Sequence, residues 1–304
     1  MITVERISEL RAHCEAARRD GKSVGLVPTM GYFHEGHRSL MRAARTETDF
    51  VVVTLFVNST QFGPTEDLAA YPKDLDGDAA VAAAEGADLL FVPPVDEMYP
   101  NGPPRTVVHV AELTDGLCGV ARPVHFDGVT TVVTKLFSIV GPSIAFFGRK
   151  DFQQLAVIRQ MTADLDFPID VRGAALVREA DGVAMSSRNA YLTEDERTAA
   201  RVLSQALQAV AMAATEGERD ARAIETRVRS IVGDQPLVAL EYVEVRDART
   251  LERRDEISGE VVVAVAAKVG RARLIDNVVL SVDGEHVDAD LGVLTGERDP
   301  RSVP

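Results

Sequence analysis

Three short segments of the chain carry side chains that could bind and activate a nucleotide. The first contains His34 and His37 in the sequence HEGH, the second is GRKDFQQ at residues 148–154, and the third is MSSRN at residues 185–189. Imidazole, ammonium, hydroxyl and guanidinium groups can all donate hydrogen bonds to phosphate oxygens. These residue types therefore favour an anion site, provided that the surrounding elements bring them to a suitable place.

A zinc site and ordinary surface or packing roles are alternative interpretations of the two histidines of HEGH. A helical zinc motif needs histidines four residues apart, whereas His34 and His37 are three apart and no third ligand is placed by the sequence. The neighbouring residues favour a phosphate-binding role for the histidines instead. Pro28 and Gly31 mark a turn after an apolar run, and Gly36 lets a ligand approach the backbone at a helix start.

GRKDFQQ follows the apolar run IAFF, so Lys150 would lie at the carboxyl end of a buried strand, where open α/β sheets bind ligands. Asp151 and Gln154 could face a neighbouring polar ligand, although a solvated helix start of mixed charge is the alternative. In MSSRN, two hydroxyls precede Arg188 and form a compact set of anion donors. The alternative is a hydrophilic linker, but the place of MSSRN between two predicted domains suits a closing lid.

The first 178 residues alternate apolar runs with helical patterns. The run FVVVTLFV at 50–57 is continuous and β-branched, as in a strand covered on both faces. We predict a Rossmann-like α/β domain at 1–178, a parallel sheet with helices on both faces. Its strands are expected at 23–27, 50–57, 88–92, 105–110, 144–147, 169–171 and 174–177, and its helices at 2–19, about 34–45, 75–85, 128–140 and 149–164.

The pattern of apolar and polar residues changes after the MSSRN segment. Thr193 and Glu196 have the spacing of a capping box, so a helix should run to about residue 214, and a second helix should span about 220–231. Alternating runs at 238–245, 259–269 and 272–282 predict an antiparallel sheet. We therefore expect a smaller C-terminal α/β lid domain at 179–282. Residues 283–304 are acidic and polar and are expected to be a disordered tail.

Composition limits the partners of such a protein. A formal charge of −14 disfavours nucleic acid and anionic membranes, which need a basic face, so anionic substrates require locally gathered cations. Two cysteines are too few for a disulfide framework, and no signal segment or apolar run of membrane-spanning length is evident. The expected location is the cytoplasm.

Five ordered motifs carry a family resemblance over most of the chain. VPTMGYFHEGH, FVNSTQFGP, ARPVHFDGV, FFGRKDFQQL and VREADGVAMSSRN resemble the pantoate:β-alanine ligase family of the nucleotidylyltransferase and class I aminoacyl-tRNA synthetase-like superfamily. HEGH corresponds to the superfamily's HxGH signature and MSSRN to its mobile KMSKS-type loop. The resemblance implies that ATP and Mg²⁺ drive the joining of pantoate to β-alanine through a pantoyl adenylate, in a homodimer.

The resemblance also implies roles for individual residues. The residues expected to stabilise the triphosphate during catalysis are His34, His37, Lys150, Ser186, Ser187 and Arg188. The wider ATP site would add Pro28, Thr29, Met30, Gly36, Gly148, Asp151, Val177 and Met185. Pantoate would be bound by Met30, Gln61, Val129, Val132, Val133 and Gln154, and Asp78 is a candidate metal-side group.

Several positions depart from the family pattern. Ser59 replaces a proline, Gly77 an acidic residue, Cys118 a glutamate, and Arg149 the glutamate of GEKD. These changes keep open a paralogous ligase that uses another small acid or amine. A nucleotidylyltransferase and a catalytically silent nucleotide-binding protein are alternatives of a different class.

Overall fold

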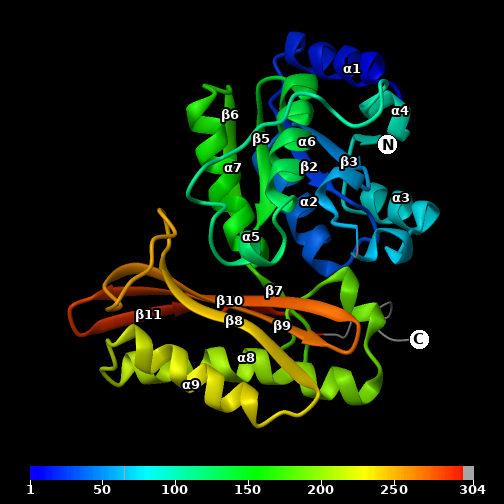
Figure 1. Cartoon of the computed structure of the whole chain (residues 1–304). Coiled ribbons are helices and arrows are strands. Elements are labelled where there is room, and N and C mark those ends of the chain that lie inside the picture. The colour runs from blue at the N-terminus through cyan, green and yellow to red at the C-terminus, as the bar shows by residue number, and fades with distance from the viewer. Residues whose placement is uncertain (65, 297–304) are drawn as a thin grey trace. The chain divides into compact units, whose positions relative to one another are not determined.

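The computed structural model describes residues 1–64 and 66–296, which divide into two compact units (Figure 1). Unit 1 comprises Met1–Phe33, His37–Arg149 and Val157–Ala174. Unit 2 comprises His34–Gly36, Lys150–Ala156 and the described residues from Ala175 onward. Two short segments that carry candidate site residues, 34–36 and 150–156, group with unit 2.

Unit 1 contains a six-stranded sheet in the order β1-β4-β3-β2-β5-β6, and every pair of neighbouring strands is parallel. This confirms the predicted parallel α/β fold, although the first strand was not expected. The strands are β1 (Ile2–Val4), β2 (Val24–Thr29), β3 (Phe50–Leu55), β4 (Leu89–Phe91), β5 (Ser143–Gly148) and β6 (Ile169–Ala174).

Both faces of this sheet are covered, as its apolar strands require. Val27, Val53 and Leu90 pack into one core together with residues of the helices at 35–47 and 75–84. Their chain neighbours Leu26 and Val52 point to the opposite face and are also fully buried, because side chains alternate along a strand. Apolar side chains on both faces of the sheet are thus kept from water.

The helices of the first 174 residues are α1 (Ile7–Arg19), α2 (Glu35–Glu47), α3 (Leu75–Ala84), α4 (Val95–Met98), α5 (Cys118–Ala121), α6 (His125–Val140) and α7 (Phe152–Asp164), with short 3₁₀ helices η1 (Ser59–Gln61), η2 (Asp67–Ala70) and η3 (Arg149–Asp151). The β-branched segment at 128–140 is helical, as predicted.

The strand predicted at 105–110 is wrong. The backbone of Val108 bonds instead to two side chains of α6: its N–H donates to Thr131 Oγ1 at 3.0 Å, and its carbonyl accepts from Thr130 Oγ1 at 2.5 Å. The segment is therefore tied to a helix rather than to a sheet edge, despite its β-branched residues.

Unit 2 is an antiparallel sheet with helices on one face (Figure 1), as the C-terminal pattern predicts. Thr193 and Glu196 form the expected capping box at the start of the first helix. The alternating strands bury one side against α8 and α9, where Val263, Leu207 and Val228 are fully buried in a single core. The elements are β7 (Val177–Arg178), η4 (Ser187–Tyr191), α8 (Glu194–Thr215), α9 (Ala221–Gly233), β8 (Val238–Asp247), β9 (Gly259–Val269), β10 (Ala272–Asp283), β11 (His286–Asp290) and β12 (Val293–Leu294).

The predicted disordered tail is wrong for its first part. Residues 286–290 form β11, which pairs antiparallel with β10, and residues 293–294 form β12, which pairs parallel with β7. These strands could not be predicted from their polar sequence, because they depend on hydrogen bonds to strands elsewhere in the fold. Residues 297–304 lie outside the described part of the chain.

Candidate active site

The strand order of unit 1 reverses between β2 and β5. From β2 the chain moves outward to β3 and β4, and it returns to add β5 on the other side of β2. In an open parallel sheet such a reversal leaves a crevice at the carboxyl ends of the two strands. The candidate residues Pro28, Thr29 and Gly148 end these strands, and Met30 follows β2.

The turn after β2 is held by a buried carboxylate. Asp78 of α3, which is 1% exposed, accepts the backbone N–H groups of Tyr32 and Phe33 at 2.6 Å each, one on each carboxylate oxygen. Gly31 has φ +86°, and a Cβ there would lie 2.9 Å from Asp78 Oδ2. The chain therefore enters the HEGH segment in a fixed conformation that requires both the glycine and the acceptor.

The hydrogen bonds of Asp78 give its carboxylate a structural role. Both oxygens of Asp78 already accept backbone hydrogen bonds in a buried position. Across residues 1–64 and 66–296, no group of three or more His, Cys, Asp and Glu side chains is placed to hold a metal ion. Asp78 is thus better explained as a residue that positions the turn.

Gln61 lies beside Met30 in unit 1. Its Nε2 is 3.1 Å from Met30 Sδ, and its Oε1 accepts from Asn58 Nδ2 at 3.1 Å. Asn58 is itself fixed, because it donates to the Gly128 carbonyl at 3.0 Å and accepts from Tyr99 Oη at 2.8 Å. The amide of Gln61 is therefore oriented by a buried network before any ligand arrives.

Helix α6 packs closely against the loop that carries Gln61. A Cβ at Gly128 would lie 2.5 Å from the backbone of Gln61, so this position admits only glycine. His125 Nδ1 is 3.0 Å from the Gln61 carbonyl oxygen. The three predicted apolar residues of this helix are all buried, namely Val129, Val132 and Val133.

An ion pair supports the same loop. Arg122 Nε donates to Glu66 Oε1 at 3.0 Å. Partial burial opposes ionisation of Glu66, but the hydrogen bonds and charge of Arg122 outweigh it and lower the pKa of the carboxyl. The pair is therefore charged at neutral pH, and it lies next to the Gln61 backbone.

In unit 2, Gly36 of the HEGH segment lies beside Met185 of the MSSRN segment. Gly36 N–H donates to His34 Nδ1 at 3.1 Å, and a Cβ at Gly36 would lie 3.8 Å from Met185 Cβ. Lys150 Nζ is 3.5 Å from Asp151 Oδ1, and both side chains reach solvent, with 20% and 46% exposure. Parts of all three predicted anion-binding segments therefore belong to one compact unit.

The MSSRN loop is anchored at both ends. Met185 N–H donates to the Val177 carbonyl at 2.9 Å, and Ser186 Oγ accepts the Arg188 N–H at 3.3 Å at the start of η4. At the far end, Asn189 Nδ2 donates to Glu179 Oε1 at 2.8 Å. The loop is therefore a built structure, not the loose hydrophilic linker that was the alternative from sequence.

Glu179 also belongs to a buried ion network. Arg197 donates to Glu179 Oε1 and to both oxygens of Asp181, each at 2.8 Å. Burial opposes the charge of Asp181, but Arg197 outweighs this and lowers the pKa of that carboxyl. No short sequence motif signals these partners, because Glu179 and Arg197 are separated by 18 positions.

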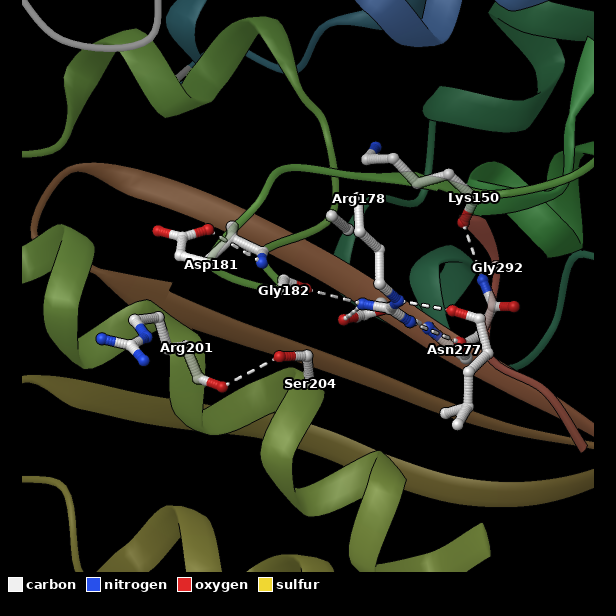
Figure 2. Close-up of polar contacts among 12 residues, drawn as sticks. Lys150, Arg178, Asp181, Gly182, Arg201, Ser204, Asn277 and Gly292 are labelled. Carbon is white, nitrogen blue, oxygen red and sulfur yellow. Dashed lines mark hydrogen bonds and ion pairs between the residues drawn. The ribbon is translucent and has the colours of Figure 1, made fainter. Parts of the chain in front are cut away.

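A second buried guanidinium lies one residue before Glu179 (Figure 2). Arg178, 3% exposed, donates to Asp276 Oδ2 at 2.7 Å and to Asp276 Oδ1 at 2.9 Å. The next residue of β10, Asn277, donates through Nδ2 to the Lys150 carbonyl at 3.0 Å. The backbone of Lys150 is thereby connected to the same ion pair that holds β7.

The predicted site residues separate into two groups. Unit 1 holds Pro28, Thr29, Met30, His37, Gly148, Gln61, Val129, Val132 and Val133, and unit 2 holds His34, Gly36, Lys150, Asp151, Gln154, Val177, Met185, Ser186, Ser187 and Arg188. Sequence reasoning missed the supporting residues Asn58, Arg178, Glu179, Arg197, Asp276 and Asn277, and it gave Asp78 a different role.

The structure bears on two of the residues that depart from the family pattern. Gly77 N–H donates to the helix cap Asp74 at 3.1 Å, and a Cβ at Gly77 would lie 2.1 Å from Asp74 Oδ2, so a larger residue there would require the Asp74 carboxylate to shift. Ser59 lies in η1 between Asn58 and Gln61, whose hydrogen bonds hold the loop without a proline. Nothing in the structure explains Arg149, and Cys118 is buried at the start of α5.

Comparisons with known proteins agree with one another. The family model for pantoate-beta-alanine ligase matches residues 2–279. Pantothenate synthetase from Geobacter sulfurreducens is 50% identical over 92% of this chain and 99% of its own length, and that from Heliobacterium modesticaldum is 50% identical over 93% and 100%.

Solved structures show the same relationship. Pantothenate synthetase from Thermus thermophilus aligns with a TM-score of 0.86 and 44% identity, over 91% of this chain and 98% of that chain. The pantoate-beta-alanine ligase from Francisella tularensis, complexed with beta-gamma ATP and beta-alanine, aligns with a TM-score of 0.75 and 29% identity, over 91% of this chain and 97% of that chain.

The role of Asp78 can be tested with a matched pair of variants. Asp78→Asn replaces one accepting oxygen by an NH₂ group, so we expect a loss of about 1–3 kcal/mol in unfolding free energy. Asp76→Asn, at an exposed position on the same helix, should change it by less than about 0.5 kcal/mol. Urea unfolding measures both. Equal stability of the two variants, with a changed Mg²⁺ requirement in Asp78→Asn alone, would restore the metal interpretation.

Proposed function

Because this chain belongs to the pantoate-beta-alanine ligase family, we propose that it condenses pantoate with β-alanine through a pantoyl adenylate. A carboxylate oxygen of pantoate attacks the α-phosphorus of ATP, and the bond to the departing pyrophosphate breaks. The β-alanine amine then attacks the acyl carbon, loses a proton and releases AMP. The observation that carries the proposal is the family match over residues 2–279.

This chemistry needs charge stabilisation and positioning rather than a protein nucleophile. We assign His34, His37, Lys150, Ser186, Ser187 and Arg188 to the triphosphate, where their donors offset the charge that develops on pyrophosphate. The grouping of HEGH beside Met185 in unit 2 supports the assignment for His34 and the MSSRN loop. The remaining ATP contacts are assigned to Pro28, Thr29, Met30, Gly36, Gly148, Asp151, Val177 and Met185.

We assign pantoate to Gln61, Met30, Val129, Val132 and Val133. Gln154 keeps the role in pantoate binding that the family resemblance implies. Support comes from the preorganised Gln61 amide, which offers a donor and an acceptor suited to a hydroxy acid. The buried valines would pack against its apolar part. The assignment of β-alanine and ATP as co-substrates is supported by the Francisella tularensis relative, which was solved with beta-gamma ATP and beta-alanine.

We further propose Mg²⁺ and a homodimer, which rest on the family resemblance, and a cytoplasmic location, which rests on the composition of the sequence. Mg²⁺ commonly binds substrate phosphates and keeps several waters, so it can enter with ATP without a dedicated protein cage. In the described chain, no helix has the length and apolar character needed to cross a membrane. Light scattering that gives the mass of one chain, 32.8 kDa, would contradict the dimer.

A panel of acids and amines tests the proposed reaction. The protein is incubated with ATP and Mg²⁺ and with each pair of a small carboxylic acid and an amine, and products are identified by mass spectrometry. We expect pantothenate and AMP from pantoate with β-alanine and markedly less AMP from every other pair.

Other results would support the alternatives. AMP from a different pair alone would indicate a paralogous ligase. Transfer of an adenylyl group to a phosphorylated acceptor would indicate a nucleotidylyltransferase, and ATP binding in calorimetry without turnover of any pair would indicate a silent protein.

The charge of Lys150 is the most direct mutational test of the site. Lys150→Met should slow pyrophosphate exchange with ATP by a factor of about 100, equivalent to about 3 kcal/mol of transition-state stabilisation. Lys268→Met is the control, because Lys268 is on β9 with 66% of its side chain exposed. An unchanged exchange rate in Lys150→Met would remove this residue from the site.

A further inference from the structure

The last two strands lie beyond the part of the chain that defines the family. The family model ends at residue 279, and the two curated relatives described above are matched over 99% and 100% of their own length by 92% and 93% of this chain. Strand β10 ends at Asp283, so β11 and β12 fall entirely outside the family match. Any role of these strands is therefore particular to this chain and those that share the extension.

The extension is packed into unit 2 rather than attached loosely. β11 continues the antiparallel sheet with a register of Val282↔Val287 and Leu280↔Ala289. Val287, Ala289 and Leu291, at every second position, pack against the core beneath α8. This alternation gives the extension one apolar face, as expected for an edge strand with a fixed register.

After β11 the chain turns and lies along β7. Gly292 has φ +83°, and a Cβ there would lie 2.3 Å from the Leu176 carbonyl oxygen, so the turn requires glycine. Val293 N–H then donates to that carbonyl at 2.7 Å, and Thr295 N–H donates to the Arg178 carbonyl at 2.8 Å. The extension thereby supplies partners for two carbonyls of residues that are less than 5% exposed.

The opposite edge of β7 carries the nucleotide loop. The Val177 carbonyl, between the two that pair with the extension, accepts the N–H of Met185 at 2.9 Å. Met185 immediately precedes Ser186, Ser187 and Arg188. β7 is thus a two-residue strand with the extension on one side and the stem of the loop on the other.

Arg178 ties the extension into the same structure (Figure 2). Its Nε donates to the Leu291 carbonyl and its Nη1 to the Gly182 carbonyl at 3.1 Å, while both terminal nitrogens hold Asp276. One buried side chain therefore joins the extension, the turn before the loop and the central strand β10. Removal of Leu291 would leave a donor of a buried guanidinium without its partner.

We propose that residues 286–295 are a positioning element of the nucleotide site, which holds β7 so that Ser186, Ser187 and Arg188 are presented to the triphosphate. The inference rests on the proposed function of that loop. The extension touches no substrate itself; it acts through β7 and the Val177–Met185 hydrogen bond. Binding of ATP and ordering of the extension are therefore energetically coupled, and the coupling is reciprocal.

A backbone variant separates this role from side-chain packing. Val293→Pro removes the N–H that donates to Leu176, whereas Val293→Thr keeps it at a position that is 54% exposed. In pyrophosphate exchange, we expect Val293→Pro to raise the KM for ATP about 3- to 10-fold, with a change of less than about 2-fold in the KM for pantoate. Val293→Thr should match the unaltered protein, and truncation after Asp283 should resemble Val293→Pro. Equal ATP KM values in all four proteins would overturn the proposal.

Hydrogen exchange of the unaltered full chain gives an answer even if these variants fold poorly. Addition of ATP with Mg²⁺ should slow exchange in peptides covering 183–188 and also in peptides covering 286–295. Protection of 183–188 without any change at 286–295 would contradict the extension's role while leaving the proposed function intact. No protection of 183–188 would contradict the nucleotide role of the loop, and the inference would fall with it.

Discussion

The reversal of strand order between β2 and β5 is the constraint on which the candidate site depends. Open parallel sheets bind ligands at the carboxyl ends of the strands where the order reverses. The turn after β2 leads from that end of the strand into the HEGH segment. Asp78 fixes that turn by accepting two backbone N–H groups, and Gly31 makes the approach possible. Because the chain has a formal charge of −14, the proposed anion site requires cations and N–H donors that are gathered locally.

The MSSRN loop, to which we assign the triphosphate, is held by buried charged residues. Arg197 pairs with Glu179 and Asp181, and Arg178 pairs with Asp276, all within unit 2. Buried ion pairs of this kind contribute modestly to stability, but loss of one partner leaves an uncompensated charge and is costly. They therefore fix the positions of β7 and of the loop more than they strengthen the fold. In this chain the C-terminal extension adds to the same support.

Much of the fold follows from local patterns. Patterns among neighbouring residues predict the buried strand β3, the alternating strands β9 and β10, and the start of a helix after Thr193. The candidate site residues could be named because they lie in short motifs at strand ends. The residues that hold these site residues in place could not be named from the sequence, since Glu179 and Arg197 come into contact only through folding. The same is true of β12, whose two exposed residues carry no pattern of their own, and of residues 105–110, where two threonines of α6 replace a strand partner.

We propose that the acid is activated by transfer of the adenylyl group to its carboxylate. Pantoate labelled with ¹⁸O in both carboxylate oxygens tests it most directly, in a reaction with unlabelled ATP, β-alanine and Mg²⁺. We expect the released AMP to carry one ¹⁸O atom from pantoate, because that oxygen bridges the acyl carbon and phosphorus in the intermediate. AMP without ¹⁸O, in a reaction that still yields pantothenate, would contradict it.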